Sequence, residues 1–178
     1  MNFEEKTLYS KNIFKGRIID VKVDTVSLPD GRKSTREIVK HASAVAIVAV
    51  DDDNNIFLVR QYRKPVEKVL LEIPAGIMET GEEPLYTAQR ELAEETGWHA
   101  EHWDKILSYY SAPGFCDEEL HLYLARGLTP GKCHFDSDEF LENVQIPLTE
   151  AYKMIFTGEI VDGKSIIGIQ YAYSRLVR

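Results

Sequence analysis

The chain has 178 residues and a mass of 20.3 kDa, which suits one domain with at most a small appendage. A formal net charge of −8 argues against a nucleic-acid duplex or an anionic membrane as the main partner. No apolar run approaches the roughly 18 residues that span a bilayer, and the first residues lack the apolar core of a signal peptide. Because the two cysteines, Cys116 and Cys133, have no metal-ligand spacing, we expect free thiols and a cytoplasmic protein.

The first predicted elements are extended. In residues 17–28, Ile19, Val21, Val23 and Thr25 alternate with their neighbours, which is the period of a strand. The sequence PDGR at 29–32 predicts a turn, after which the chain runs extended through 35–50. That run ends in AVAIVAV, which is continuously apolar and therefore predicts a strand buried on both faces.

The acidic run DDDNN at 51–55 has two interpretations. Its alternating oxygens resemble the start of a calcium-binding loop, but Ile56 stands where that loop needs glycine and Tyr62 where it needs glutamate. We therefore predict a hairpin turn at this point. Further strands are predicted at 56–63, 69–73, 105–111, 120–126 and 140–146, and helices at 84–96, 149–157 and 164–177. Strands of mixed character alternating with helices predict an α/β fold with a mixed sheet flanked by helices.

The helix at 84–96 has clear boundary signals. Thr80 and Glu83 fit the spacing of a capping box, Pro84 suits the first turn, and Gly97 stands where a helix commonly ends in a glycine. We expect Leu92 and its neighbours to pack on the sheet.

The adjacent flank of this helix gathers Glu91, Glu94 and Glu95 within one turn, and Arg90 is placed to pair with Glu94. A solvated acidic face is the simplest alternative. It is disfavoured because each like-charge pair costs about 0.2–0.5 kcal/mol and the helix C-terminus disfavours anions. A divalent cation would relieve the repulsion, and clustered carboxylates suit Mg²⁺ or Mn²⁺.

The same stretch resembles the signature of the Nudix hydrolase family, G-x5-E-x7-R-E-U-x-E-E-x-G-U, where U is a bulky apolar residue. The matching residues are Gly76, Glu82, Arg90, Glu91, Leu92, Glu94, Glu95, Gly97 and Trp98. The resemblance implies an α/β/α sandwich and hydrolysis of a nucleoside diphosphate linked to another group. It implies that Glu91, Glu94 and Glu95 bind Mg²⁺, or Mn²⁺, together with the carbonyl of Ala75. Glu94 and Glu95 are thereby also catalytic, while Gly76, Glu82, Arg90 and Gly97 support the site.

Shorter motifs are similar to those of the ADP-ribose pyrophosphatase subfamily, including REIVKH, VRQYRKP, EIPAG and SAPGF. This resemblance implies cleavage of ADP-ribose to AMP and ribose 5-phosphate, with substrate contacts from Arg36, Arg63, Ile77, Pro113, Gly114 and Glu118. For Arg63 the alternative is a surface strand arginine, and for Arg36 it is an ordinary pair with Glu37 or a neighbouring strand. Other nucleotide-sugar or dinucleotide pyrophosphatases remain alternatives, as does a sensor that binds ADP-ribose without cleaving it.

Similar enzymes supply the general base from a loop beyond the signature. That region is FDSDEFLENV at 135–144, and we select Glu139 over Asp136, Asp138 and Glu142 because it directly precedes apolar residues. Residues 1–41 are expected to form a small β-subdomain that makes a homodimer, with 42–178 as the hydrolase domain. Phe3, Tyr9 and Phe14 are all candidates to stack on adenine.

Overall fold

The computed structural model describes residues 2–131 and 140–177. These residues divide into two compact units. The N-terminal unit contains the chain up to Ser43 together with Tyr109–Glu119, and the larger unit contains Ala44–Ser108 and the chain from Leu120 onward. No helix in the two described ranges has the length and apolar character needed to cross a membrane.

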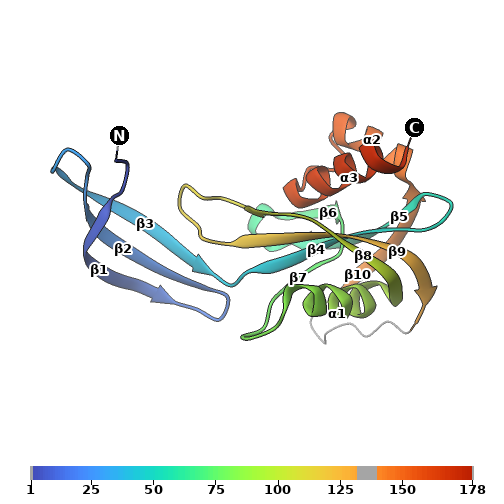
Figure 1. Ribbon diagram of the computed structural model, residues 1–178, viewed down its shortest axis with the longest axis horizontal. Helices are drawn as coiled ribbons and strands as arrows, with labels where there is room; N and C mark the ends of the chain where they lie inside the picture. The colour runs from blue at the N-terminus through green and yellow to red at the C-terminus, as the bar shows by residue number, and fades with distance from the viewer. Residues whose placement is uncertain (1, 132–139, 178) are drawn as a thin grey trace. The chain divides into compact units, whose positions relative to one another are not determined.

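The N-terminal unit is built on a three-stranded antiparallel sheet in the order β1–β2–β3, drawn in shades of blue in Figure 1. The strands are β1 (Lys6–Lys15), β2 (Ile19–Ser27) and β3 (Lys33–His41). A turn at Gly31, where φ is 85°, joins β2 to β3 as PDGR predicts. The strand predicted at 17–28 is confirmed, whereas β1 was not predicted because its polar and apolar residues do not alternate cleanly.

The most buried positions of β2 lie on the face opposite the predicted apolar one. Asp24 and Val26 are buried, while the four side chains that define the predicted alternation are half-buried. Asp24 accepts hydrogen bonds from Ser10 Oγ at 2.5 Å and from Lys22 Nζ at 2.9 Å. These bonds hold the pKa of the Asp24 carboxyl below its usual range, so the buried group stays ionised and paired.

The larger unit contains a seven-stranded sheet in the order β10–β5–β4–β9–β8, with β6 also paired to β5 and β7 also paired to β4. Its strands are β4 (Ala44–Val50), β5 (Asn55–Arg63), β6 (Lys68–Glu72), β7 (Ala75–Ile77), β8 (Trp98–Tyr110), β9 (Glu119–Pro130) and β10 (Leu141–Pro147). Strands β4 and β9 pair in parallel, whereas β5 pairs antiparallel with β4, β6 and β10. The predicted mixed sheet is confirmed. The sequence did not predict the short β7, and β8 begins well before residue 105.

All seven residues of β4 are buried, as the apolar run predicts. The following acidic run forms the β4–β5 turn, in which Asp51 Oδ1 accepts hydrogen bonds from the backbone N–H groups of Asn55 at 2.8 Å and Asp53 at 3.0 Å. Asn54 adopts a left-handed conformation with φ of 59°. The hairpin interpretation is therefore confirmed over the calcium loop.

Helices cover both faces of this sheet (Figure 1). Helix α1 (Pro84–Thr96) lies on one face, and α2 (Leu148–Thr157) and α3 (Gly163–Leu176) lie on the other. Ala88 and Leu92 of α1 form a buried cluster with alternate residues of β4. On the opposite face, Gly168 lets α3 approach closely, since a Cβ there would lie 2.6 Å from Val48 Cγ2. The result is an α/β/α sandwich, and all three predicted helices are confirmed to within a residue.

Candidate active site

Helix α1 begins and ends as its flanking residues dictate, with one exception. Pro84 is the first helical residue, and Gly97 ends the helix with φ of 73° while donating its N–H to Ala93 O at 2.9 Å. The capping-box prediction is wrong. Glu83 is the N-cap, and within the described residues its side chain makes no capping hydrogen bond.

Glu82 takes the role that the capping box would have filled. One oxygen of Glu82 accepts hydrogen bonds from the backbone N–H of Glu79 and from Thr87 Oγ1, both at 2.9 Å. Arg90 donates to the same carboxylate at 3.2 Å. The bonds from Arg90 and the Glu79 N–H lower the pKa of Glu82 to about 2. Glu82 therefore stays ionised and fixes the loop before α1 to the helix.

Arg90 is the cation around which the α1 carboxylates gather. Its Nη1 donates to Glu91 Oε1 at 2.7 Å and to Glu94 Oε2 at 2.9 Å, so the predicted pair with Glu94 is confirmed. Its Nη2 also reaches the carbonyl oxygen of Ile77 at 3.5 Å. One guanidinium thus ties Glu82, Glu91 and Glu94 to strand β7.

Strand β7 lies directly against two of the α1 carboxylates. Glu95 is 4% exposed and accepts a hydrogen bond from the backbone N–H of Ala75 at 3.1 Å. Glu91 lies over Gly76 so closely that a Cβ on that residue would fall 1.9 Å from Glu91 Cδ. The signature glycine is therefore required by Glu91, because a side chain at residue 76 would occupy the volume of its carboxylate.

The donor atoms suit a hard divalent cation. In residues 2–131 and 140–177, the acidic, histidine and cysteine side chains form no group of three or more in metal-ligating geometry. The guanidinium of Arg90 supplies the positive charge between Glu91 and Glu94 in this arrangement. However, Glu91, Glu94 and Glu95 lie on one helix beside the backbone of β7 and offer oxygen donors, which fits Mg²⁺ or Mn²⁺ better than zinc.

Arg63, the last residue of β5, belongs to a partly buried ion-pair network that the sequence did not predict. Its Nε and Nη2 donate to the two oxygens of Glu72 at 2.9 and 2.8 Å, and Lys164 Nζ donates to Glu72 from α3. Burial alone would raise the pKa of Glu72, but the bonds from Arg63 and Lys164 outweigh it and lower the pKa. The signal in the sequence was a lone glutamate in the apolar run VLLEI, since a buried carboxylate requires cationic partners.

The NUDIX domain family matches residues 40–166 of the chain, which includes all of these residues. This chain belongs to the Nudix family. A second family, the nucleoside diphosphate sugar hydrolase N-terminal domain, matches residues 5–39.

Two relatives align over nearly the full Nudix chain. An ADP-ribose pyrophosphatase of Bacillus subtilis is 48% identical over 172 residues, which are 96% of this chain and 93% of the relative. A methanol dehydrogenase activator of Bacillus methanolicus is 47% identical over 171 residues, covering 95% and 92% of the two chains. The crystal structure of an ADP compounds hydrolase matches with a TM-score of 0.86 at 20% identity, covering 99% of this chain and 98% of the other, which confirms the fold.

The remaining substrate residues predicted from the Nudix resemblance lie in the N-terminal unit, except Ile77, which is exposed on β7. Arg36 pairs with Glu5, to which its Nε donates at 2.7 Å. Pro113 and Gly114 lie in a turn that is followed by Phe115. The carbonyl oxygen of Phe115 accepts a hydrogen bond from the backbone N–H of Val39 in β3 at 2.7 Å.

Glu118 follows that turn in the same unit. One of its carboxylate oxygens lies 3.6 Å from His41 Nδ1. The neighbouring Asp117 accepts the backbone N–H of His41 at 3.0 Å and also pairs with Lys40. Asp117 therefore bonds the segment after the turn to β3, whereas Glu118 is the carboxylate that lies next to the imidazole ring of His41.

The predicted general base is one of four candidate carboxylates beyond β9. Glu139, Asp136 and Asp138 lie outside the described residues. Glu142, the fourth candidate, is an exposed residue of β10 and accepts a hydrogen bond from Arg60 Nη1 at 2.8 Å.

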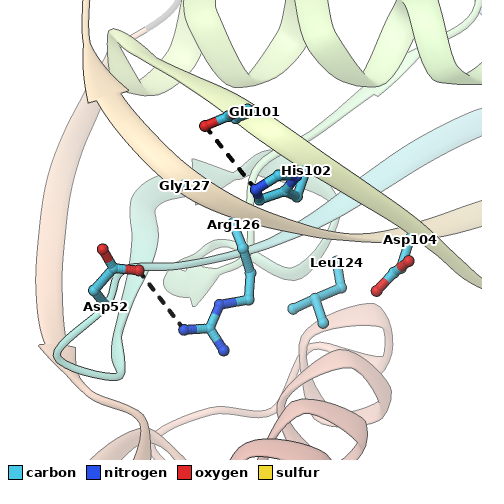
Figure 2. Close-up of a pocket in the computed structure, with 7 residues that line it drawn as sticks. All are labelled: Asp52, Glu101, His102, Asp104, Leu124, Arg126 and Gly127. Carbon is cyan, nitrogen blue, oxygen red and sulfur yellow. Dashed lines mark ion pairs between the residues drawn. The ribbon is translucent and has the colours of Figure 1, made fainter.

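A surface cavity of about 310 Å³ lies elsewhere on the larger unit (Figure 2). It is lined by Asp52, Glu101, His102, Asp104, Leu124, Arg126 and Gly127, so the described lining includes none of the α1 carboxylates. Arg126 Nη2 lies 3.9 Å from Asp52 Oδ1, and His102 lies 4.0 Å from Glu101. The cavity is therefore separate from the Nudix signature.

Proposed function

We propose that this chain hydrolyses the pyrophosphate bond of ADP-ribose, giving AMP and ribose 5-phosphate, in a reaction that depends on Mg²⁺. The observation that carries the proposal is the intact signature: Glu91 and Glu95 lie against Gly76 and Ala75, with Arg90 between the acidic side chains. Support for the substrate comes from the 48% identity to an ADP-ribose pyrophosphatase over nearly the whole chain.

Glu91, Glu94, Glu95 and the carbonyl of Ala75 would hold the divalent cation, with Mg²⁺ preferred and Mn²⁺ as the second choice. When bound, such a cation neutralises pyrophosphate charge and activates water. Arg90 and Glu82 orient the carboxylates, while Gly76 and Gly97 allow the close approach and the helix end. Glu139 is the proposed base that takes a proton from the attacking water.

Six residues are assigned to substrate binding. Arg63 would bind a phosphate with its guanidinium, which offers a planar set of donors. We assign Arg36 to the nucleoside, Ile77 to the substrate beside the cation, and Pro113, Gly114 and Glu118 to the terminal ribose. Each assignment predicts a rise in KM when the residue is substituted.

A second candidate function is hydrolysis of another nucleoside diphosphate derivative. It is favoured by the match of residues 5–39 to the N-terminal domain of nucleoside diphosphate sugar hydrolases. A binding module without activity is less well supported, because every carboxylate of the signature is present.

The two enzymatic candidates differ in their preferred substrate. Purified protein with Mg²⁺ should be assayed on ADP-ribose, ADP-glucose, NADH, a diadenosine polyphosphate and ATP. The proposal expects the highest kcat/KM for ADP-ribose, whereas a higher value for a nucleotide sugar or dinucleotide would favour the second candidate. A folded protein that binds ADP-ribose but cleaves none of the panel would favour the binding module.

We further propose that the protein is a cytoplasmic homodimer formed through residues 1–41. All ten residues of β1 are exposed, including the apolar Leu8, Ile13 and Phe14. Such a surface is commonly covered by a partner subunit. Light scattering at micromolar concentration should give the mass of two chains, and deletion of residues 1–40 should yield a monomer or a precipitate. A full-length monomer would refute the dimer.

A further inference from the structure

The motif DGKS at 162–165 contributes nothing to the Nudix signature, yet its side chains are bonded to the segment that leads into β7. Asp162 is the N-cap of α3 and accepts hydrogen bonds from the Ser165 backbone N–H at 3.0 Å and from Ser165 Oγ at 2.5 Å. Ser165 Oγ in turn accepts the backbone N–H of Ile73 at 2.8 Å. The start of α3 is therefore fixed to the residue that immediately follows Glu72.

Lys164 is the charged member of this motif. Its Nζ donates to Glu72 and lies 3.1 Å from Asp162 Oδ2, and its side chain is 11% exposed. Glu72 is 1% exposed, so taking its charge out of water is costly unless cations offset it. Lys164 and Arg63 are those cations, which approach the carboxylate from α3 and β5.

Arg63 uses only one edge of its guanidinium for Glu72. The bonds run from Nε and Nη2, which are two of its five N–H donors. The N–H groups of Nη1 and the second one of Nη2 bond to no acceptor in residues 2–131 and 140–177, and the side chain is 39% exposed. This outer edge has the planar pair of donors that a phosphate accepts side by side.

The charge of one predicted metal ligand, Glu95, also acts on the Arg63 guanidinium. The bond to Glu72 raises its pKa, and the charges of Glu95 and Asp162 raise it further. Glu95 accepts the backbone N–H of Ala75, three residues beyond Glu72. Arg63 therefore lies within electrostatic reach of Glu95, one of the carboxylates that would hold the cation.

We propose that Glu72 and Lys164 are positioning residues, which lock one edge of the Arg63 guanidinium so that its outer edge binds a substrate phosphate. This inference rests on the proposed function for its substrate. Lys164 has a second effect through charge, because it pairs with both Glu72 and Asp162 and offsets their negative charges. Without Lys164, these two carboxylates would cancel more of the positive charge of Arg63, and the attraction for phosphate would fall.

The experiment compares affinity for ADP by calorimetry at constant Mg²⁺, a measurement that requires no turnover. We expect Arg63→Gln to weaken ADP binding about ten- to a hundredfold, the value of a charge-assisted hydrogen bond. Lys164→Met should weaken it about tenfold through the lost charge balance. The matched control is Lys64→Met, which removes a lysine next to Arg63 whose exposed pair with Glu67 contributes little, so affinity should stay within about twofold.

A double-mutant cycle separates positioning from general structure. In the Arg63→Gln background, Lys164→Met should add less than about twofold, because the residue it positions is already gone. Glu72→Gln removes the anchor of the guanidinium but leaves both cations, so a loss of ADP affinity in this variant reports positioning alone. If Glu72→Gln fails to fold, Lys164→Met decides alone.

Several results would overturn the proposal. One is wild-type ADP affinity in Lys164→Met. Another is an equal loss of ADP affinity on adding Lys164→Met to the wild type and to Arg63→Gln, which would show that Lys164 has only a structural role. Wild-type affinity in Arg63→Gln, or no ADP binding by the wild type, would also overturn it. In contrast, ADP binding with the expected coupling but no cleavage of ADP-ribose would refute the proposed function and leave the positioning role standing.

Discussion

Replacing Gly76 with alanine should damage the active site while sparing the fold. A Cβ at residue 76 would lie 1.9 Å from Glu91 Cδ and 2.1 Å from its Oε1. Since an ordinary contact begins at about 3.4 Å, Oε1 has to retreat by about 1.3 Å, the difference between the two distances. The displaced atoms are the end of a flexible side chain, so we expect the free energy of unfolding to fall by only about 1 kcal/mol.

The effect on catalysis should be much larger. A misplacement of about 1 Å in a catalytic group can cost a hundredfold in rate, so kcat/KM for ADP-ribose in Gly76→Ala should fall about a hundredfold. Calorimetry should also show weaker binding of Mn²⁺. Gly163→Ala is the matched control, because a Cβ there meets no atom within 4 Å apart from its chain neighbours and the nearby backbone of its own helix. Wild-type turnover and metal affinity in Gly76→Ala would refute the reasoning that Glu91 must occupy this position.

Three further predictions concern carboxylates. Glu95→Gln should lower kcat by orders of magnitude with the circular dichroism spectrum unchanged, and near-wild-type turnover at saturating Mg²⁺ would exclude Glu95 as a metal ligand. Glu139→Gln should lower kcat with little change in KM, and the loss of kcat should shrink at higher pH. Wild-type kinetics in Glu139→Gln together with an inactive Glu142→Gln would identify Glu142 as the base instead. The hydrogen bonds from Arg90 and the Glu79 N–H lower the pKa of Glu82 from 4.5 to about 2. The stabilisation of the folded state by these bonds is therefore complete above pH 4.5 and is lost as the pH falls toward 2. Urea unfolding at decreasing pH should show that the free energy of unfolding of the wild type falls by at most about 3 kcal/mol through this group. The fall should be smaller in Glu82→Gln, and an equal fall in both proteins would contradict the stabilising role of Glu82.

Local sequence signals were sufficient for the elements that combine a strong period with clear ends. Helix α1 was predicted at its observed bounds because Pro84 and Gly97 limit it and Leu92 marks its buried side. The capping box failed because Glu82, rather than Thr80, reaches the backbone of its own loop, a choice that depends on Arg90. Competition between such nearby side chains is not visible in spacing alone.

Contacts between distant parts of the chain could not be predicted. Glu72 and Lys164 are 92 residues apart, and nothing in either local sequence indicates that α3 starts beside the end of β6. Strand β7 has three residues, which is too short to show a period, although it carries the backbone against which Glu91 and Glu95 lie. Strand β1 was missed because all of its side chains are exposed, so it shows no buried face.

The most direct test of the central claim is the product analysis of ADP-ribose incubated with the purified protein and Mg²⁺. We expect equal amounts of AMP and ribose 5-phosphate with Mg²⁺, none with EDTA, and none from a Glu91→Gln, Glu94→Gln, Glu95→Gln triple variant that remains folded. Undiminished cleavage in EDTA or in that folded variant, or intact ADP-ribose after incubation with the wild-type protein, would contradict it.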